Sequence, residues 1–168
     1  MQDAVECPSG GRGQAPRPTM DDVLNVLRQA ALFEGLSQEE LQAIAALCQS
    51  QAFRSGEIIT TQGEHGDELF VVSQGFVEVT LINPAGGGEP RIVVQLGPGQ
   101  IVGEMSLVDR GPRSATVRAL TDGAMLQALK RDAFLQLCQT NTHLGYLVMR
   151  NMAADLSFKL RHRMLTGR

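Results

Sequence analysis

The sequence predicts a mainly β fold with helices at both ends (an α+β arrangement), in which the strands form an antiparallel barrel or jelly roll. Between Phe53 and Leu129, short β-type runs are separated by glycines, without helical apolar spacing between them. Before and after this region, apolar residues recur at helical intervals. Several short, closely spaced strands with no helices between them favour an antiparallel roll over a parallel sheet.

The first ordered element is predicted to begin near residue 20. Residues 1–18 contain many Gly and Pro residues and no periodic apolar face, so we interpret 1–19 as a disordered tail. Met20 follows directly and is an alternative start to Met1. Thr19 and Asp22 are typical of a helix start, because a hydroxyl can cap a free backbone N–H. The apolar residues that follow at helical spacing are Val23, Val26, Leu27 and Ala30.

A second helix is predicted over residues 38–49. Ser37 and Glu40 fit the capping box, in which each side chain accepts from the other residue's backbone N–H. The apolar residues behind this box share one face and are Leu41, Ile44, Ala45 and Cys48. The two helices together make up a predicted N-terminal segment, residues 20–52.

The β-roll is predicted over residues 53–131. In "FVEVTLI", Val77, Val79 and Leu81 face one way, whereas Glu78 and Thr80 face the other. The "NPAGGGEP" stretch after it is typical of a hairpin loop. Further strands are predicted over 91–96, up to Val102, and over 114–120 and 124–129.

Helical spacing returns in the C-terminal segment, residues 132–168, as one short face near Ala133 and Phe134 and a longer helix over about 141–165. The longer helix carries two apolar stripes. One stripe is Leu144, Leu147, Val148, Phe158 and Leu165, and the other is Met149, Met152, Leu156, Leu160 and Met164. We expect the first stripe to pack on the roll and the second, which contains Met152 and Leu156, on a partner, either a second copy of the chain or an unidentified protein. The alternative is a core helix with a loosely patterned exposed side.

Composition narrows the functional classes. The chain has 168 residues and a net charge of −3, so no basic surplus indicates nucleic-acid binding, and we expect no sequence-specific DNA binding. Three distant cysteines without a CxxC motif predict neither disulfides nor zinc, and a reducing, cytoplasmic location. No apolar run approaches the ~18 residues that a membrane helix needs.

Motifs of catalysis are not evident, and we predict that the chain is not an enzyme, with no catalytic residue, metal or cofactor. His65, His143 and His162 are isolated and lack metal-ligand or triad spacing. Ser106 lacks the G-x-S-x-G elbow, and no phosphate-binding G-x-x-x-x-G-K-[ST] occurs.

The stretch "GEMSLVDRGPRSATVRA" places one carboxylate, Glu104, nine residues before one guanidinium, Arg113. Free N–H groups at the start of a short helix favour an anion, and Gly103 lets a ligand approach the backbone. The guanidinium fork of Arg113 suits a phosphate. Glu104 would oppose an anion but accepts hydrogen bonds from a sugar hydroxyl. A small molecule that carries both a phosphate and a ribose hydroxyl accounts for both residues.

These stretches resemble the cyclic nucleotide-binding domain, the family of bacterial catabolite activator proteins, regulatory subunits of the cyclic-AMP-dependent kinase and cyclic-nucleotide-gated channels. The resemblance covers about residues 32–138 and rests on "FRSGEIITTQGEHGDELFVVSQGFVEV" and "LGPGQIVGEMSLVDRGPRSATVRAL". It implies a double-stranded β-helix, with a phosphate-binding cassette over 102–115. It also implies a sensor module that relays ligand binding through its C-terminal helix.

The resemblance implies a role for each residue of the cassette. The backbone amides of Glu104, Met105 and Ser106 would face the cyclic phosphate, Glu104 would accept from the ribose 2′-hydroxyl, and Arg113 would pair with the phosphate. Ser114 would add hydrogen bonds near the phosphate or base. The whole set of expected binding residues is Gly103, Glu104, Met105, Ser106, Arg113, Ser114 and Ala115, with Val94 and Val102 as walls of the sugar and base pocket.

Two departures from the family pattern bear on the ligand. Val102 stands where an aromatic residue often precedes the G-E pair, and it still fills an apolar slot. Ser114 replaces the Thr often linked to cyclic GMP and the Ala linked to cyclic AMP, so the choice stays open, and we expect cyclic AMP rather than cyclic GMP.

Two other interpretations remain. One is a nucleotide-blind interaction module of the same fold, in which Glu104 and Arg113 form an ion pair. The other is a transcription regulator without its DNA-binding part.

Overall fold

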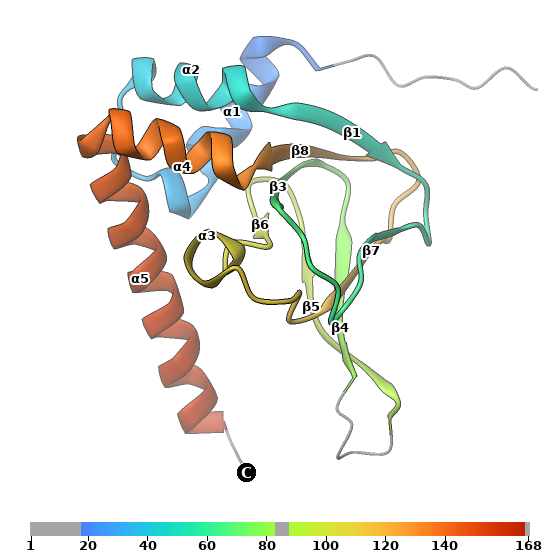
Figure 1. The fold of residues 1–168 in the computed structure, drawn as a ribbon. Coiled ribbons are helices and arrows are strands. Elements are labelled where there is room, and N and C mark those ends of the chain that lie inside the picture. Colours follow the sequence, from blue (N-terminus) through green and yellow to red (C-terminus); the bar gives the residue numbers. More distant parts are fainter. Residues whose placement is uncertain (1–17, 83–87, 167–168) are drawn as a thin grey trace, which may run out of the picture.

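A computed structural model describes the backbone of residues 18–82 and 88–166, and side chains up to residue 162. Residues 1–17 of the predicted tail, and most of the loop after "FVEVTLI", lie outside this described part. In it, two four-stranded antiparallel sheets face each other, in the orders β1-β8-β3-β6 and β2-β7-β4-β5 (Figure 1). This confirms the predicted roll with flanking helices. The strands are β1 Gln49–Phe53, β2 Ile58–Thr60, β3 Glu68–Gln74, β4 Val77–Ile82, β5 Pro90–Leu96, β6 Ile101–Val102, β7 Thr116–Ala119 and β8 Ala124–Lys130.

Both predicted N-terminal helices are present, and each begins with a capping box. Helix α1, Met20–Gln29, starts after Thr19, whose Oγ1 accepts from the Asp22 N–H at 3.2 Å. A 3₁₀ turn, η1, follows over Ala31–Phe33. Helix α2, Gln38–Leu47, starts after Ser37, whose N–H donates to Glu40 at 2.9 Å. Thr19 therefore belongs to the folded part rather than to the predicted tail.

The first strand begins earlier than expected. We predicted a helix to residue 49 and strands from Phe53, but α2 ends at Leu47 and β1 begins at Gln49. The Q-S-Q-A sequence of β1 lacks an apolar alternation, so its pattern did not predict a strand. Backbone pairing with β8 over Gln49–Phe53 holds this edge strand in place. Ser50 adds a side-chain hydrogen bond to Gln127 at 2.8 Å.

Strand β3 separates two apolar cores. Leu69 and Val71 pack with the helices, whereas Phe70 and Val72 pack between the two sheets. Because both faces of β3 are covered, its sequence is a continuous apolar run rather than an alternating one. The roll and the helices are thereby joined through one strand that also pairs with β6 beside the expected site.

The remaining helices are α3 Ser106–Asp109, α4 Arg131–Thr140 and α5 Thr142–Thr166. The prediction that α5 carries two separate apolar stripes is wrong for its first half. Met152 was assigned to the partner stripe but is buried in the same core as Leu144 and Val148. Phe158 was assigned to the inner stripe but is exposed. Buried and exposed apolar residues are therefore separated along the helix rather than around it. Only the first half of α5 packs in the core that it shares with the other helices (Figure 1).

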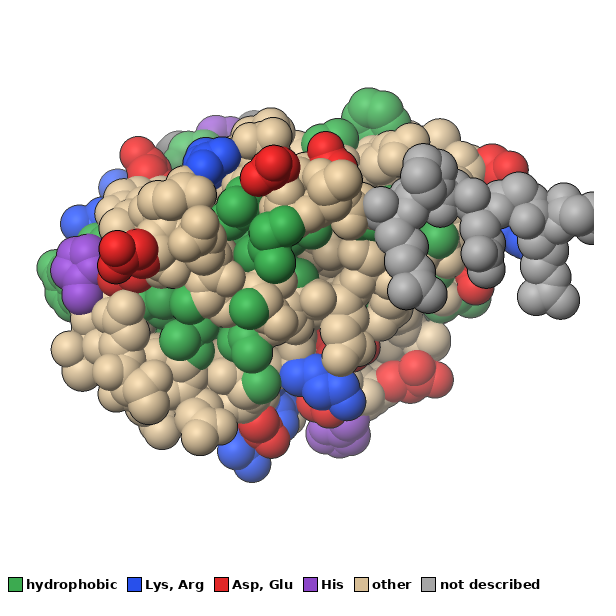
Figure 2. All heavy atoms as spheres, turned by 90° about the horizontal axis from the view of Figure 1, so that it is seen from above, with side chains coloured by type: hydrophobic (Ala, Val, Ile, Leu, Met, Phe, Trp, Pro, Cys, Tyr) green, Lys and Arg blue, Asp and Glu red, His purple; other side chains and the backbone are tan. Residues whose placement is uncertain are grey.

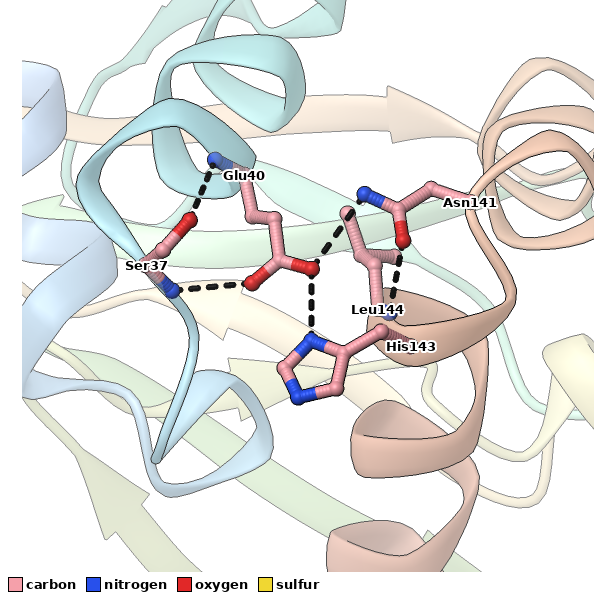
Figure 3. Close-up of polar contacts among 5 residues, drawn as sticks. All are labelled: Ser37, Glu40, Asn141, His143 and Leu144. Atoms are coloured by element: carbon pink, nitrogen blue, oxygen red, sulfur yellow. Dashed lines mark hydrogen bonds and ion pairs between the residues drawn. The ribbon is translucent and has the colours of Figure 1, made fainter.

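A buried carboxylate fixes the junction between α4 and α5. Glu40 accepts from Asn141 Nδ2 at 3.2 Å and lies 2.8 Å from His143 Nδ1, while Asn141 Oδ1 caps the Leu144 N–H at 3.0 Å (Figure 3). Burial by itself raises the pKa of Glu40, but the hydrogen bonds from His143, Ser37 and Asn141 and the His143 charge outweigh it, so the pKa is lowered. The start of α5 is therefore tied to the N-terminal helices.

Seen from the side of α2 and β1, the surface carries apolar patches with charged side chains of both signs around them (Figure 2). In the part of the chain that the structure describes, no helix is both long and apolar enough to cross a membrane. Among the described residues, Cys48 and Cys138 are free thiols, the first half-buried and the second buried. Burial raises the pKa of the Cys48 thiol to about 12.

Candidate functional site

The residues selected from the sequence meet in one cavity of about 340 Å³. It is bounded by β5, β6, α3, β7 and the turn before β7, and α5 contributes one residue, Lys159. The expected residues that line it are Val94, Val102, Gly103, Glu104, Met105, Ser106, Arg113, Ser114 and Ala115. All the selected residues are therefore brought together.

The turn between β6 and α3 shapes one wall of this cavity. Gly103 has a φ of 82°, a conformation that glycine adopts readily and other residues avoid. The Ser106 N–H donates to the Gly103 carbonyl at 3.2 Å, and its hydroxyl donates to the same oxygen at 2.7 Å. The Ser106 amide is thus used within the turn here, whereas it was expected to face a ligand.

Arg113 lies against two glycines. A Cβ atom at Gly66 or at Gly103 would overlap its guanidinium. The backbone N–H of Arg113 donates to the Glu64 carbonyl at 2.8 Å, and its side-chain Nη2 donates to the Glu68 carbonyl at 2.7 Å. Both acceptors belong to the segment 64–68, which contains Gly66. This segment therefore sets the position of Arg113.

One donor of Arg113 is left over. Nη1 is buried and makes no hydrogen bond within the described residues. Burial lowers the pKa of Arg113, the Glu68 and Asp67 charges oppose that shift, and the Arg131 charge adds to it. A buried donor without an acceptor costs about 1–3 kcal/mol, so an anion that reached Nη1 would gain a strong, charge-assisted hydrogen bond.

Glu104 is bound by a residue of α5. Lys159 Nζ lies 3.0 Å from Glu104 Oε1 and 2.7 Å from Asp155 Oδ2. No ion pair joins Glu104 to Arg113 among the described side chains, although the nucleotide-blind interpretation rests on such a pair. The Glu104 carboxylate and the Arg113 guanidinium thus line one cavity but have different partners.

Sequence reasoning missed Gly66, Glu68 and Lys159. Gly66 was treated only as one of the glycines between the predicted strands, and no sequence pattern reveals that Arg113 occupies the place of its Cβ. Glu68 contributes through its backbone carbonyl, which no side-chain pattern reveals. Lys159 belongs to no motif of the cassette, and it reaches the site only through the path of α5.

A sequence model of the cyclic nucleotide-binding domain matches residues 50–141. The chain belongs to the cyclic nucleotide-binding domain family. This confirms the resemblance seen in the cassette, and the two facing sheets with flanking helices are the fold of that family.

Curated relatives of this domain include a receptor and a kinase. The chain is 37% identical over 135 residues to the cyclic AMP receptor protein of Thermus thermophilus, covering 80% of this chain and 59% of the relative. It is 33% identical over 118 residues to the cGMP-dependent protein kinase, isozyme 1, of Drosophila melanogaster, covering 70% of this chain and 15% of the relative. The domain thus spans only part of each relative's length.

Solved structures agree with this assignment. The crystal structure of the Thermus thermophilus catabolite activator protein has a TM-score of 0.72 at 37% identity, over 81% of this chain and 61% of that chain. The regulatory domain of Toxoplasma gondii PKA, crystallised with cAMP, has a TM-score of 0.65 at 27% identity, over 74% of this chain and 46% of that chain.

Proposed function

We propose that this domain binds a cyclic mononucleotide in the 340 Å³ cavity, prefers cyclic AMP to cyclic GMP, and passes the binding event on through α5. The domain acts as a regulatory sensor and carries out no chemical reaction. The free, poorly exposed thiols Cys48 and Cys138 support a reducing, cytoplasmic setting.

The single observation that carries the proposal is the buried Nη1 of Arg113, a residue that lines the cavity, because this donor has no partner among the described residues. A cyclic phosphate bears one negative charge and supplies the acceptor that this donor lacks. Nη2 already donates to the Glu68 carbonyl, so the guanidinium is held in place before a phosphate arrives. Such preorganisation lowers the cost of binding.

Glu104 supplies the ribose contact. Its carboxylate lines the same cavity as Arg113 and accepts hydrogen bonds, whereas a phosphate would repel it. We expect Glu104→Gln to lose discrimination between cyclic AMP and 2′-deoxy cyclic AMP, measured by calorimetry. Equal binding of both nucleotides by the unaltered chain would contradict the ribose assignment.

The preference for cyclic AMP rests on one weaker support, because Ser114 lines the cavity but is neither the Thr linked to cyclic GMP nor the Ala linked to cyclic AMP in the family. The Thermus thermophilus relative at 37% identity is named a cyclic AMP receptor, and the fly relative named a cGMP-dependent kinase is at 33%.

The experiment is a calorimetric titration of the full chain with cyclic AMP and with cyclic GMP. We expect Arg113→Leu to weaken cyclic AMP binding by about 2–5 kcal/mol, since it removes one partner of a desolvated charge pair. The matched control is Arg91→Leu, an exposed arginine on β5 that does not line the cavity. Equal affinities of the two variants would contradict the role of Arg113.

A further inference from the structure

Helix α5 reaches the cavity through one charged side chain. Lys159 Nζ contacts Glu104 Oε1 at 3.0 Å, across 55 residues of sequence, and the same ammonium contacts Asp155 Oδ2 one helical turn earlier at 2.7 Å. Lys159 thus bridges the helix to the carboxylate that we assign to the ribose.

Little of the Glu104 side chain is accessible. Its side chain is 17% exposed, and the Lys159 side chain is 55% exposed. A ligand in the cavity and the Lys159 ammonium would therefore share the small accessible part of Glu104. Burial lowers the pKa of Lys159, but the hydrogen bond to Asp155 and the charge of Glu104 outweigh burial and raise it, which keeps the ammonium charged.

The ion pair also lies between two cavities. A second cavity of about 270 Å³ is bounded by η1, the turn between β5 and β6, and α5. Glu104 and Lys159 line both cavities. Separation of this pair would join the two spaces beside α5 and leave room for the helix to move.

We propose that Lys159 is a latch, which holds the second half of α5 on the roll through Glu104 and is released when a nucleotide ribose takes its place on that carboxylate. The inference rests on the proposed function and names how the site controls the helix. Phe158 and Leu160 are exposed, so this half of α5 gains little from apolar packing, and one charged contact weighs heavily in its position.

Competition for Glu104 makes the coupling reciprocal. If the nucleotide loosens the latch, then removal of the latch strengthens nucleotide binding by the same factor. Ion pairs at this degree of exposure are worth little, which limits the expected change to roughly two- to fivefold. A contact of this strength shifts the balance between the held and released positions of α5, and both positions stay populated.

The first test measures hydrogen exchange of residues 156–162 without added nucleotide. Lys159→Met is compared with Arg161→Met, which removes the same charge two residues away and lines neither cavity. We expect exchange to be roughly two- to fivefold faster in Lys159→Met and in Glu104→Gln than in Arg161→Met. Asp155→Asn controls for the contact within the helix, since it leaves the Glu104 pair in place. Equal exchange in Lys159→Met and Arg161→Met would overturn the latch.

The second test is calorimetry with cyclic AMP on the same full-length variants. We expect Lys159→Met to bind roughly two- to fivefold more tightly than the unaltered chain, with Arg161→Met unchanged. Weaker binding by Lys159→Met would make Lys159 a ligand contact and overturn the latch. Unchanged binding would also overturn it. A lack of binding of both cyclic nucleotides by the unaltered chain would instead contradict the proposed function, and the competition with it.

Discussion

At the scale of the residue, Gly66 has a steric task rather than a conformational one. Its φ is not in the left-handed region, but the place of its Cβ is taken by the Arg113 guanidinium. Gly63 is the opposite case, with a φ of 85° and open space around its Cβ. Two glycines three residues apart thus serve different purposes.

This contrast gives a paired prediction. We expect Gly66→Ala to displace Arg113 and weaken cyclic AMP binding about tenfold or more, a loss of about 1.4 kcal/mol. We expect Gly63→Ala to lower the free energy of unfolding by about 1–2 kcal/mol, because alanine resists the left-handed conformation, with little effect on affinity. Calorimetry and thermal unfolding of both variants measure the two effects. Equal loss of affinity in both would contradict the steric role of Gly66.

At the scale of the element, the Glu40 cluster predicts how stability depends on pH. The pKa of folded Glu40 lies below its usual value of 4.5, so its stabilising contribution is present above about pH 4.5 and is lost as the pH falls through the folded pKa. We expect Glu40→Gln to unfold more easily at neutral pH and to lose less stability on acidification below that value.

The control for this prediction is Glu39→Gln, which removes an exposed charge from the same first turn of α2. Thermal unfolding is followed from pH 7 to pH 3 for both variants and the unaltered chain. A similar acid response of Glu40→Gln and the unaltered chain would contradict the assigned role of the cluster.

Elements that depend on local chemistry were predictable, and those that depend on distant contacts were not. The Ser37–Glu40 box starts α2 because its partners are three residues apart, and the motifs around Glu104 and Arg113 lie within one short stretch that the sequence displays directly. Strand β1 was missed because its polar sequence is held by pairing with β8, far along the chain. Lys159 was missed because its place depends on the path of α5 past the roll.

At the scale of the whole molecule, the outer half of α5 presents two large apolar side chains to solvent. Phe158 and Leu160 are 64% and 56% exposed, whereas Met152, which we had placed on the partner side, is 2% exposed. The homodimer through α5 therefore stays a proposal, with its contact moved outward along the helix.

Light scattering tests this assembly. We expect the unaltered chain to be a dimer and the double variant Phe158→Glu, Leu160→Glu to be a monomer that still binds cyclic AMP. Substitution of Met152 is unsuitable, since a charge there would disrupt the core. A monomeric unaltered chain at high concentration would contradict the dimer.

The charge of the molecule supports a further negative prediction. The net charge is −3, and charged side chains of both signs are scattered over the face seen in Figure 2. We expect no sequence-specific DNA binding by this chain, with or without cyclic AMP. Selection from a random DNA pool that returned one consistent motif at physiological salt would contradict this expectation.

The most direct test of the central claim is an NMR titration of the isotope-labelled chain with cyclic AMP. If the nucleotide binds in the cavity, the amide signals of residues 103–106 and 113–115 and the guanidinium signals of Arg113 shift as the nucleotide is added. Shifts confined to other parts of the chain, or no shifts at millimolar cyclic AMP, would contradict the account.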